Sequence, residues 1–214
     1  MTGCCEPDDY ESVFTGRFAR RAARRYRRHG LSPTAKRIVR FISENGVRDA
    51  TVLEIGGGVG EIQLELLNQG ASHATNLEIS TNYEREATRL LASSGAADRV
   101  TRRFLDIATA GADVEPADVV VLHRVVCCYP DYGALLSAAG SHARRLLVYS
   151  HPAENRATRA MIWSENAIRR LRRNEFRAYV HPTEAMVATA EAQGLSAIYR
   201  HHAWDWEVVG LKRG

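Results

Sequence analysis

Acidic and glycine residues with a fixed spacing lie between residues 51 and 60. This segment reads TVLEIGGGVG, a short apolar run that contains Glu54 and then breaks into glycines. The glycines are Gly56, Gly57, Gly58 and Gly60. A helix-like stretch, residues 61–69, follows them. A buried strand, a tight glycine turn and a helix N-terminus together bring backbone N–H groups and the positive end of a helix dipole against a nucleotide-like ligand.

The spacing of these glycines distinguishes two kinds of nucleotide site. A dinucleotide-binding fingerprint has glycines at its first, third and sixth positions. The sixth position counted from Gly56 is Glu61, and counted from Gly58 it is Gln63. Glycines at 56, 58 and 60 after Glu54 instead resemble the acidic-x-Gly-x-Gly-x-Gly signature of class I S-adenosylmethionine-dependent methyltransferases. The resemblance covers about residues 45–214, and it implies S-adenosylmethionine as the cofactor.

Alternating strand-like and helix-like segments after residue 50 predict an α/β fold. Five strands are expected at 51–55, up to 79, 100–105, 117–122 and 145–149, with helices at 61–69, 82–93 and 132–142. Repeated βα units imply a doubly wound parallel sheet with helices on both faces. Two final strand-like runs, 196–201 and 206–212, are joined by a short turn and must pair antiparallel. We therefore predict a mostly parallel, seven-stranded, Rossmann-like sheet with an antiparallel last strand.

Two helices are predicted ahead of the first strand. Residues 10–30 read as one helix with an apolar residue at every fourth position. Ser32 and Pro33 are typical of the start of a second helix, which runs to Gly46. We expect residues 1–46 to form a helical lid over a cofactor-binding domain at 47–214. An insertion at 152–180 is expected to complete the lid.

Acidic residues at the ends of successive predicted strands suit the ribose diol and the cationic parts of S-adenosylmethionine. Glu78 lies 24 residues after Glu54, and a similar spacing places the acidic residue that accepts ribose hydroxyls in dinucleotide folds. The resemblance implies that Asp106 accepts the adenine amino group and that Glu54 orders the turn. The predicted cofactor-binding residues are Glu54, Gly56, Gly57, Gly58, Gly60, Glu78, Ile79, Asp106, Ile107 and His123.

Candidate catalytic residues lie at the ends of the later strands. His123 and His151 could each act as a general base if the acceptor must lose a proton. Residues 119–130 and 177–181 resemble the corresponding segments of magnesium-protoporphyrin O-methyltransferases. Those enzymes carry a His just before the Tyr-Pro pair, where this chain has Cys128. The predicted catalytic residues are His123, Cys128 and His151.

The four cysteines form two adjacent pairs, Cys4-Cys5 and Cys127-Cys128. If the N-terminal segment covers the cofactor cleft, the pairs can meet and offer four sulfurs to zinc or a soft metalloid. Adjacent cysteines chelate a single ion poorly, however, and match no C-x-x-C pattern, so no metal ligands are predicted. Arg124 is expected to lower the pKa of the second pair and to keep a fraction of it as thiolate.

Composition and charge bound the possible partners. The chain has 214 residues, 45% of them hydrophobic, which suits one globular domain. It has no apolar stretch near the roughly 20 residues that span a bilayer and no secretion signal, so we expect a cytoplasmic protein. The formal charge is +4, with arginine-rich segments at 17–28 and 169–177. No RNA-binding signature accompanies them, so solvated helix faces or an anion-binding pocket are favoured over nucleic acid.

These features predict methyl transfer to an oxygen, nitrogen or sulfur of a small-molecule acceptor, an anionic one included. Transfer from a sulfonium requires positioning more than acid–base assistance, because the leaving thioether is neutral. Two alternatives are an RNA methyltransferase and a non-catalytic S-adenosylmethionine-binding protein. The sequence names neither the acceptor nor the oligomeric state.

Overall fold

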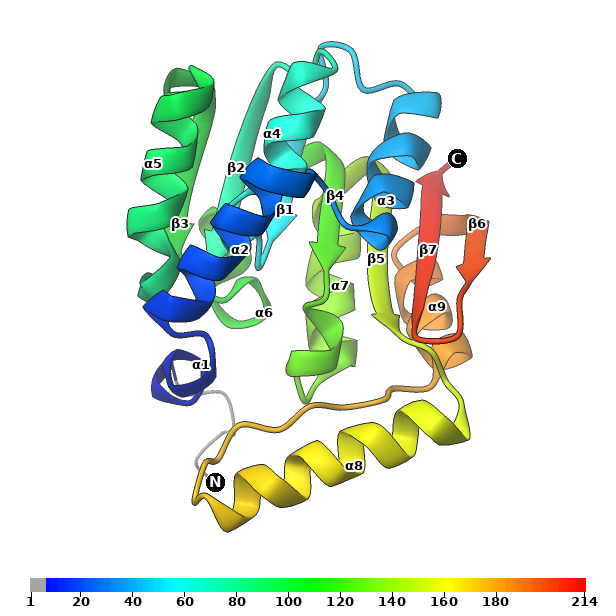
Figure 1. Cartoon of the computed structure of the whole chain (residues 1–214). Coiled ribbons are helices and arrows are strands. Elements are labelled where there is room, and N and C mark those ends of the chain that lie inside the picture. Colours follow the sequence, from blue (N-terminus) through cyan, green and yellow to red (C-terminus); the bar gives the residue numbers. More distant parts are fainter. Residues whose placement is uncertain (1–6) are drawn as a thin grey trace.

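A mixed seven-stranded sheet forms the centre of the molecule (Figure 1). The computed structural model describes residues 7–214, with side chains from residue 10 onward. The strand order is β3-β2-β1-β4-β5-β7-β6. Strand β7 is antiparallel to both of its neighbours, and the other neighbouring pairs are parallel. The strands are β1 (Thr51–Ile55), β2 (His73–Glu78), β3 (Val100–Phe104), β4 (Ala117–His123), β5 (Ala143–Pro152), β6 (Leu195–His202) and β7 (Trp206–Arg213). The predicted fold class is thereby confirmed.

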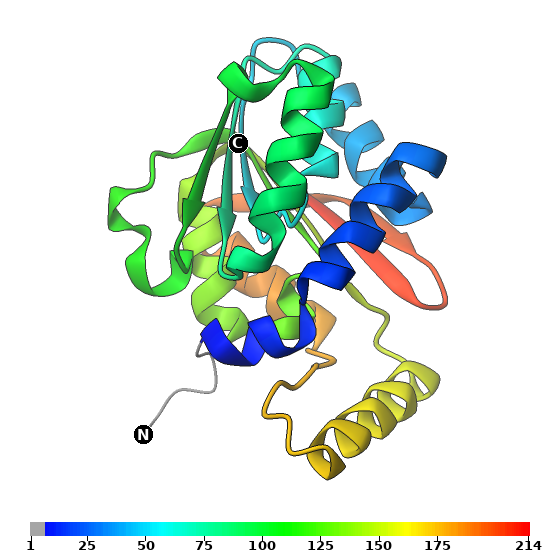
Figure 2. The same ribbon diagram turned by 60° about the vertical axis from the view of Figure 1, so that its left-hand side comes forward.

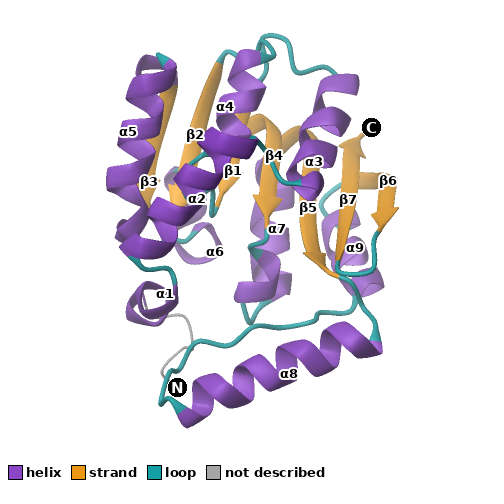
Figure 3. Cartoon of the chain, in the orientation of Figure 1, coloured by secondary structure: helices purple, strands orange, loops and turns teal. Residues whose placement is uncertain are grey.

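Helices cover both faces of this sheet (Figure 2), and Figure 3 shows the strands enclosed between them. The described helices are α1 (Pro7–Val13), α2 (Gly16–His29), α3 (Pro33–Glu44), α4 (Glu61–Asn68), α5 (Glu84–Ser94), α6 (Ile107–Ala110), α7 (Tyr132–His142), α8 (Arg156–Leu171) and α9 (Thr183–Glu191). Alternate residues of β4 serve two cores. Val119 and Val121 pack under α2 to α5, whereas Val120 and Leu122 pack under α6, α7 and α9. This alternation is the period of two that a strand imposes.

The prediction of one helix over residues 10–30 is wrong. Helix α1 ends at Val13, and α2 begins at Gly16. Thr15 separates them because its side chain caps α2, accepting a hydrogen bond from the Phe18 backbone N–H at 3.4 Å. Ser32 caps α3 in the predicted way, with its hydroxyl 3.2 Å from the Ala35 backbone nitrogen.

Helices α2 and α3, which fall within the predicted lid, pack into the core of the domain. Ile38 and Ile42 of α3 are fully buried in the same core as Leu64 of α4. Ala19 and Ala23, on the inner face of α2, belong to that core as well. Helices α2 and α3 are therefore part of the layer that covers the sheet. Helix α1 and the start of α2 therefore remain the candidates for a lid.

Two segments lie beyond the carboxyl ends of the parallel strands (Figure 1). One is α1. The other is α8 with the extended segment 172–182 that leads back to the body, and α8 stands apart from the sheet in both views (Figure 2). Among the described residues, no helix combines the length and the apolar character that crossing a membrane requires.

Candidate functional site

The glycine turn after β1 adopts backbone conformations that only glycine accepts readily. Gly56, Gly58 and Gly60 have φ angles of +63°, +54° and +85°. A Cβ atom on Gly56 would come within 2.5 Å of the Val125 side chain, and one on Gly58 within 3.2 Å of Tyr83. The turn thus brings bare backbone to the carboxyl edge of the sheet, directly ahead of α4.

A buried polar network holds this turn from below. The Glu54 carboxylate accepts the Gln63 backbone N–H at 3.1 Å, and the Asn76 side-chain amide donates to the Gln63 side chain at 3.0 Å. Arg102 donates to the Gly58 carbonyl at 3.2 Å. The sequence analysis missed Gln63, Asn76 and Arg102. An asparagine within an apolar strand was the available signal, because a buried amide needs a partner.

Burial of Glu54 is the main cause of its high pKa, which rises to about 8, with the nearby Glu61 charge adding to the shift. The carboxyl group is therefore mostly protonated at neutral pH in the ligand-free protein. In the ligand-free protein Glu54 thus anchors the glycine turn as a neutral, hydrogen-bonded side chain.

We expect Glu54→Gln to reduce the pH dependence of stability. The folded pKa of Glu54 is about 8 against an ordinary 4.5, so its contribution to stability is lost as the pH rises through that window. His123 opposes this trend only below pH 6.5, because its pKa falls from 6.5 to about 3. Between pH 6.5 and 8 the wild type should lose about 2 kcal/mol more than the variant. Urea unfolding at both pH values measures the difference, and equal losses would contradict the assignment.

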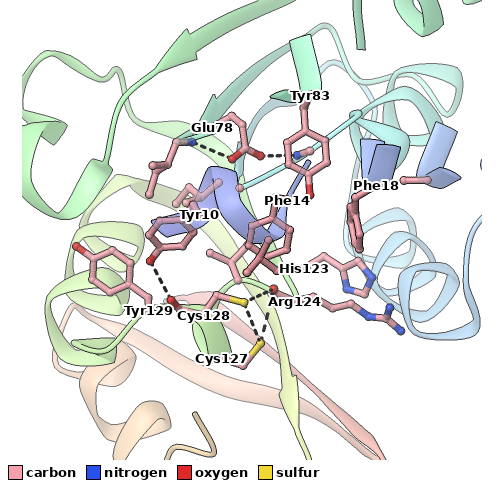
Figure 4. A pocket seen from close by; sticks show the side chains of 18 of the residues that line it. Tyr10, Phe14, Phe18, Glu78, Tyr83, His123, Arg124, Cys127, Cys128 and Tyr129 are labelled. Atoms are coloured by element: carbon pink, nitrogen blue, oxygen red, sulfur yellow. Dashed lines mark hydrogen bonds between the residues drawn. The ribbon is translucent and has the colours of Figure 1, made fainter. Parts of the chain in front are cut away.

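Glu78 lies at the end of β2 and faces the glycine turn. Its carboxylate accepts backbone N–H groups from Gly58 at 2.9 Å, Ile79 at 2.8 Å and Ser80 at 3.1 Å (Figure 4). Burial raises the pKa of Glu78, while these N–H groups act in the opposite direction. The carboxylate is thus fixed in one orientation at the edge of a cavity.

That cavity has a volume of about 820 Å³ and lies at the carboxyl ends of β1, β2 and β4. Its size is within the range of ligand and cofactor pockets. Of the predicted site residues, those that line it are Glu54, Gly56, Gly57, Gly58, Glu78, Ile79, Asp106, Ile107, His123 and Cys128. Gly60 and His151 do not line it. Gly60 instead ends the turn as the N-cap of α4.

An aromatic wall closes the cavity on the side of α1, and the sequence analysis did not place it there. Phe14 lies at its centre, with ring centroids 6.3 Å from Tyr10 and 5.6 Å from both Phe18 and Phe176. Tyr83 extends the wall toward the glycine turn, with its ring 6.3 Å from that of Phe14 (Figure 4). These rings come from α1, α2, η1 (Thr81–Tyr83) and the segment after α8. Only the fold brings them together.

Asp106 is held by its neighbours at the end of β3. One carboxylate oxygen accepts the Ala108 backbone N–H at 2.9 Å and so caps α6, and the other accepts the Tyr129 hydroxyl at 2.7 Å. The carboxylate therefore reaches the cavity already oriented. Neighbouring Ile107 is buried beside it.

The two histidines predicted as general bases lie in different surroundings, since His123 lines the cavity and His151 does not. Burial, with Arg124 and Arg25 nearby, lowers the pKa of His123 to about 3, so the ring is neutral at physiological pH. A base with so low a pKa holds a proton poorly. His151 is fully buried, and its Nδ1 lies 3.0 Å from the Pro152 carbonyl oxygen. Its position in the sheet, against β7, keeps it away from the cavity.

Both cysteines of the second pair line the cavity, with their sulfurs 3.6 Å apart. The expected low thiol pKa is wrong for Cys128. Its hydrogen bond with Cys127 and its burial raise the pKa of this thiol well above the ordinary value. Among the described residues no three metal-binding side chains gather, and Cys4 and Cys5 lie outside them.

Arginines from three parts of the chain line the cavity. They are Arg21, Arg25, Arg124 and Arg169. Arg124 follows β4 with a φ of 61°, a conformation unusual for a residue with a side chain. Its guanidinium lies 4.7 Å from the centre of the Trp206 ring. The cavity is thus lined by arginines and aromatic rings as well as by acidic residues and the bare backbone of the glycine turn.

The chain is similar to known methyltransferases in sequence and in fold. Residues 23–200 match the family described as methyltransferase domain. Magnesium protoporphyrin IX methyltransferase from Synechocystis PCC 6803, solved with S-adenosylhomocysteine, has a TM-score of 0.75 and 19% identity, over 97% of this chain and 99% of that one. An O-methyltransferase family protein from Burkholderia thailandensis has a TM-score of 0.69 and 18% identity, over 94% of this chain and 64% of that one.

A third similar structure comes from a complex of Haloferax volcanii that contains the Trm112 methyltransferase activator. The match has a TM-score of 0.73 and 12% identity, and it covers 96% of each chain. None of the curated proteins matches the chain in sequence. The family match extends over most of the chain, and it includes the glycine turn and the acidic residues that follow β2 and β3. The chain therefore belongs to the methyltransferase domain family and is a class I S-adenosylmethionine-dependent methyltransferase.

Proposed function

We propose that this enzyme methylates a small, anionic organic acceptor inside the 820 Å³ cavity. The observation that carries the proposal is the continuity of that cavity from the glycine turn to the arginines. One cavity reaches both Glu78 and Arg124, and α1 and α8 contribute residues to its wall. An acceptor seated among arginines and aromatic rings would lie beside the cofactor.

The part of the cavity at the glycine turn suits S-adenosylmethionine. Glu78 would accept the ribose hydroxyls, and Asp106 would accept the adenine amino group. The bare backbone at Gly56 and Gly58 leaves room that a Cβ atom would fill. When bound, the cofactor supplies an electrophilic methyl group on a sulfonium. Glu54 is buried at the base of the turn. The positive charge of a bound sulfonium would favour the ionised form of its carboxyl group.

The arginines and aromatic rings of the cavity suit the acceptor. Arg25, Arg124 and Arg169 would hold an anionic group such as a carboxylate or phosphate. Phe14 and Phe176 would exclude water and pack against an apolar body. His123, neutral and hydrogen-bonded to Ser150 at 2.9 Å, would orient the acceptor through a hydrogen bond rather than remove its proton.

The covering segments are α1 and residues 152–180. The Tyr10 hydroxyl donates to the Cys128 carbonyl at 2.8 Å, which fixes α1 against the turn after β4. From the other side, the Tyr179 backbone N–H donates to the Cys127 carbonyl at 2.8 Å. Both segments thus contact the turn that carries the cysteine pair, and we propose that they form the lid over the acceptor.

Deletion of residues 1–13 should leave a folded protein that binds S-adenosylhomocysteine but has lost most of its turnover. The deletion removes Tyr10 from the cavity wall and spares Ala19 and Ala23, which belong to the core. Thermal unfolding with S-adenosylhomocysteine and a methyl-transfer assay measure the two properties. Unchanged turnover would show that α1 is not part of the lid, and an unfolded product would make it structural.

Transfer of labelled methyl groups tests the proposed acceptor class. The enzyme would receive labelled S-adenosylmethionine with either a pool of small organic acids and phosphates or total RNA. We expect label in the small anions only. Arg124→Gln should raise the KM for the acceptor, whereas the matched variant Arg48→Gln, an exposed residue ahead of β1, should not. Label in RNA alone, or in neither pool, would contradict the proposal and favour the RNA or the non-catalytic alternative.

A further inference from the structure

Several large apolar side chains of α8 are exposed, and α8 lies at the edge of the molecule (Figure 1). Trp163 is 73% exposed and Leu171 is 85% exposed. Met161 and Ile168 are each about half exposed. Side chains of this size are normally covered, and a contiguous exposed apolar surface marks an interaction site.

Three of these residues lie on the side of the helix away from the cavity. Residues 160, 163, 167 and 171 follow each other at intervals of three and four. Ile168 lies beside this row, whereas Met161 lines the cavity. Ile162 and Arg169 lie on the inner side, where they line the cavity. One face of α8 thus forms part of the cavity wall. The opposite face has no partner within the described part of the chain.

Positive charge surrounds the apolar face. Residues 156–177 contain seven arginines and two glutamates. Arg159, Arg169 and Arg177 have acidic partners in Glu154, Glu165 and Glu175. No ion pair is found within the described residues for the remaining four arginines, which are Arg156, Arg170, Arg172 and Arg173.

We propose that the outward face of α8, with its flanking arginines, binds the surface of an anionic lipid bilayer. Amphipathic helices with arginines beside tryptophan and leucine lie in the plane of a membrane, with the apolar face among the headgroups. The charge also distinguishes lipid from a second copy of the chain. Two copies that paired through α8 would bring their unpaired arginines together, whereas an anionic surface neutralises them.

This orientation has a consequence for the cavity. The inner face of α8 lines the cavity while its outer face would lie on the lipid, so the acceptor side of the enzyme would face the membrane. The β6–β7 turn is tied to the same end of the molecule. The Asn155 side chain, which caps α8, donates to the Trp204 carbonyl at 2.9 Å, and Trp204 is itself largely exposed.

Flotation with vesicles tests the proposal on the full-length protein. We expect binding to vesicles that contain phosphatidylglycerol, weak binding to pure phosphatidylcholine, and loss of binding as salt increases. The double variant Trp163→Ser/Leu171→Ser should weaken binding roughly tenfold or more. Ile198→Ser, which removes an exposed apolar residue from β6, should leave it unchanged. Arg170→Glu/Arg173→Glu should abolish the preference for anionic lipid, and Arg48→Glu should not.

Three results would overturn the inference. The first is equal or absent binding of the wild type to both kinds of vesicle. The second is retained binding in the folded Trp163→Ser/Leu171→Ser variant, with folding checked by circular dichroism. The third is a dimer, seen by sedimentation without lipid, that the same variant disrupts; this would assign the face to a second copy.

Discussion

Replacing Glu78 with alanine should weaken S-adenosylhomocysteine binding by about 1.5–3 kcal/mol, a loss of roughly 10- to 150-fold. In the proposed site the carboxylate would accept the ribose hydroxyls, and in the structure it accepts the Gly58, Ile79 and Ser80 backbone N–H groups. Its removal would leave these donors without their acceptor beside the glycine turn. Both the ligand contact and the preformed shape of the site would be lost.

Calorimetric titration measures this effect against two controls. Glu78→Gln retains an acceptor oxygen and should lose less affinity than the alanine variant. Glu115→Ala changes an exposed acidic residue outside the cavity and should have no effect. An unchanged affinity in Glu78→Ala would assign the ribose contact to another residue.

The largest expected effect on stability is that of Gly57→Ala, about 3 kcal/mol. A Cβ atom at this position would lie 2.8 Å from the Glu54 carboxyl carbon and closer still to the Asn76 amide. Both side chains are buried and hydrogen-bonded to the Gln63 residue, so neither can move aside freely. The substitution must therefore break the network or displace the turn.

Gly16→Ala is the matched control for this substitution. Gly16 is the first residue of α2, and its nearest neighbour would be the Arg20 side chain at 4.0 Å. Alanine should leave stability unchanged or raise it slightly, because alanine favours helices. If urea unfolding shows equal stabilities for the two variants, the buried network is not what holds the turn.

Local sequence was sufficient to predict the order of elements. Strand β1 has the predicted bounds, Thr51–Ile55, because a short apolar run between turn residues has few alternatives. Strand β5 is longer than predicted, since His151 and Pro152 pair with Glu207 and Trp206 of β7. A local sequence pattern does not show which distant segments a strand pairs with.

The candidate site was predictable where it depends on one segment and not where it depends on several. The glycine turn and Glu78 reach the cavity as expected, since each follows a strand directly. Phe176 meets Phe14 only because the segment after α8 returns across the strand ends. The direction of the Cys128 pKa was misjudged for a different reason. The hydrogen bond with the adjacent Cys127, together with burial, outweighs the nearby charge of Arg169.

Titration of the wild-type protein with S-adenosylhomocysteine and, separately, with NAD tests the central claim most directly. The account predicts one bound S-adenosylhomocysteine per chain and a rise in melting temperature that grows with ligand concentration. NAD should produce neither. Binding of NAD without binding of S-adenosylhomocysteine would contradict the assignment of the glycine turn, Glu78 and Asp106 to a methyl donor.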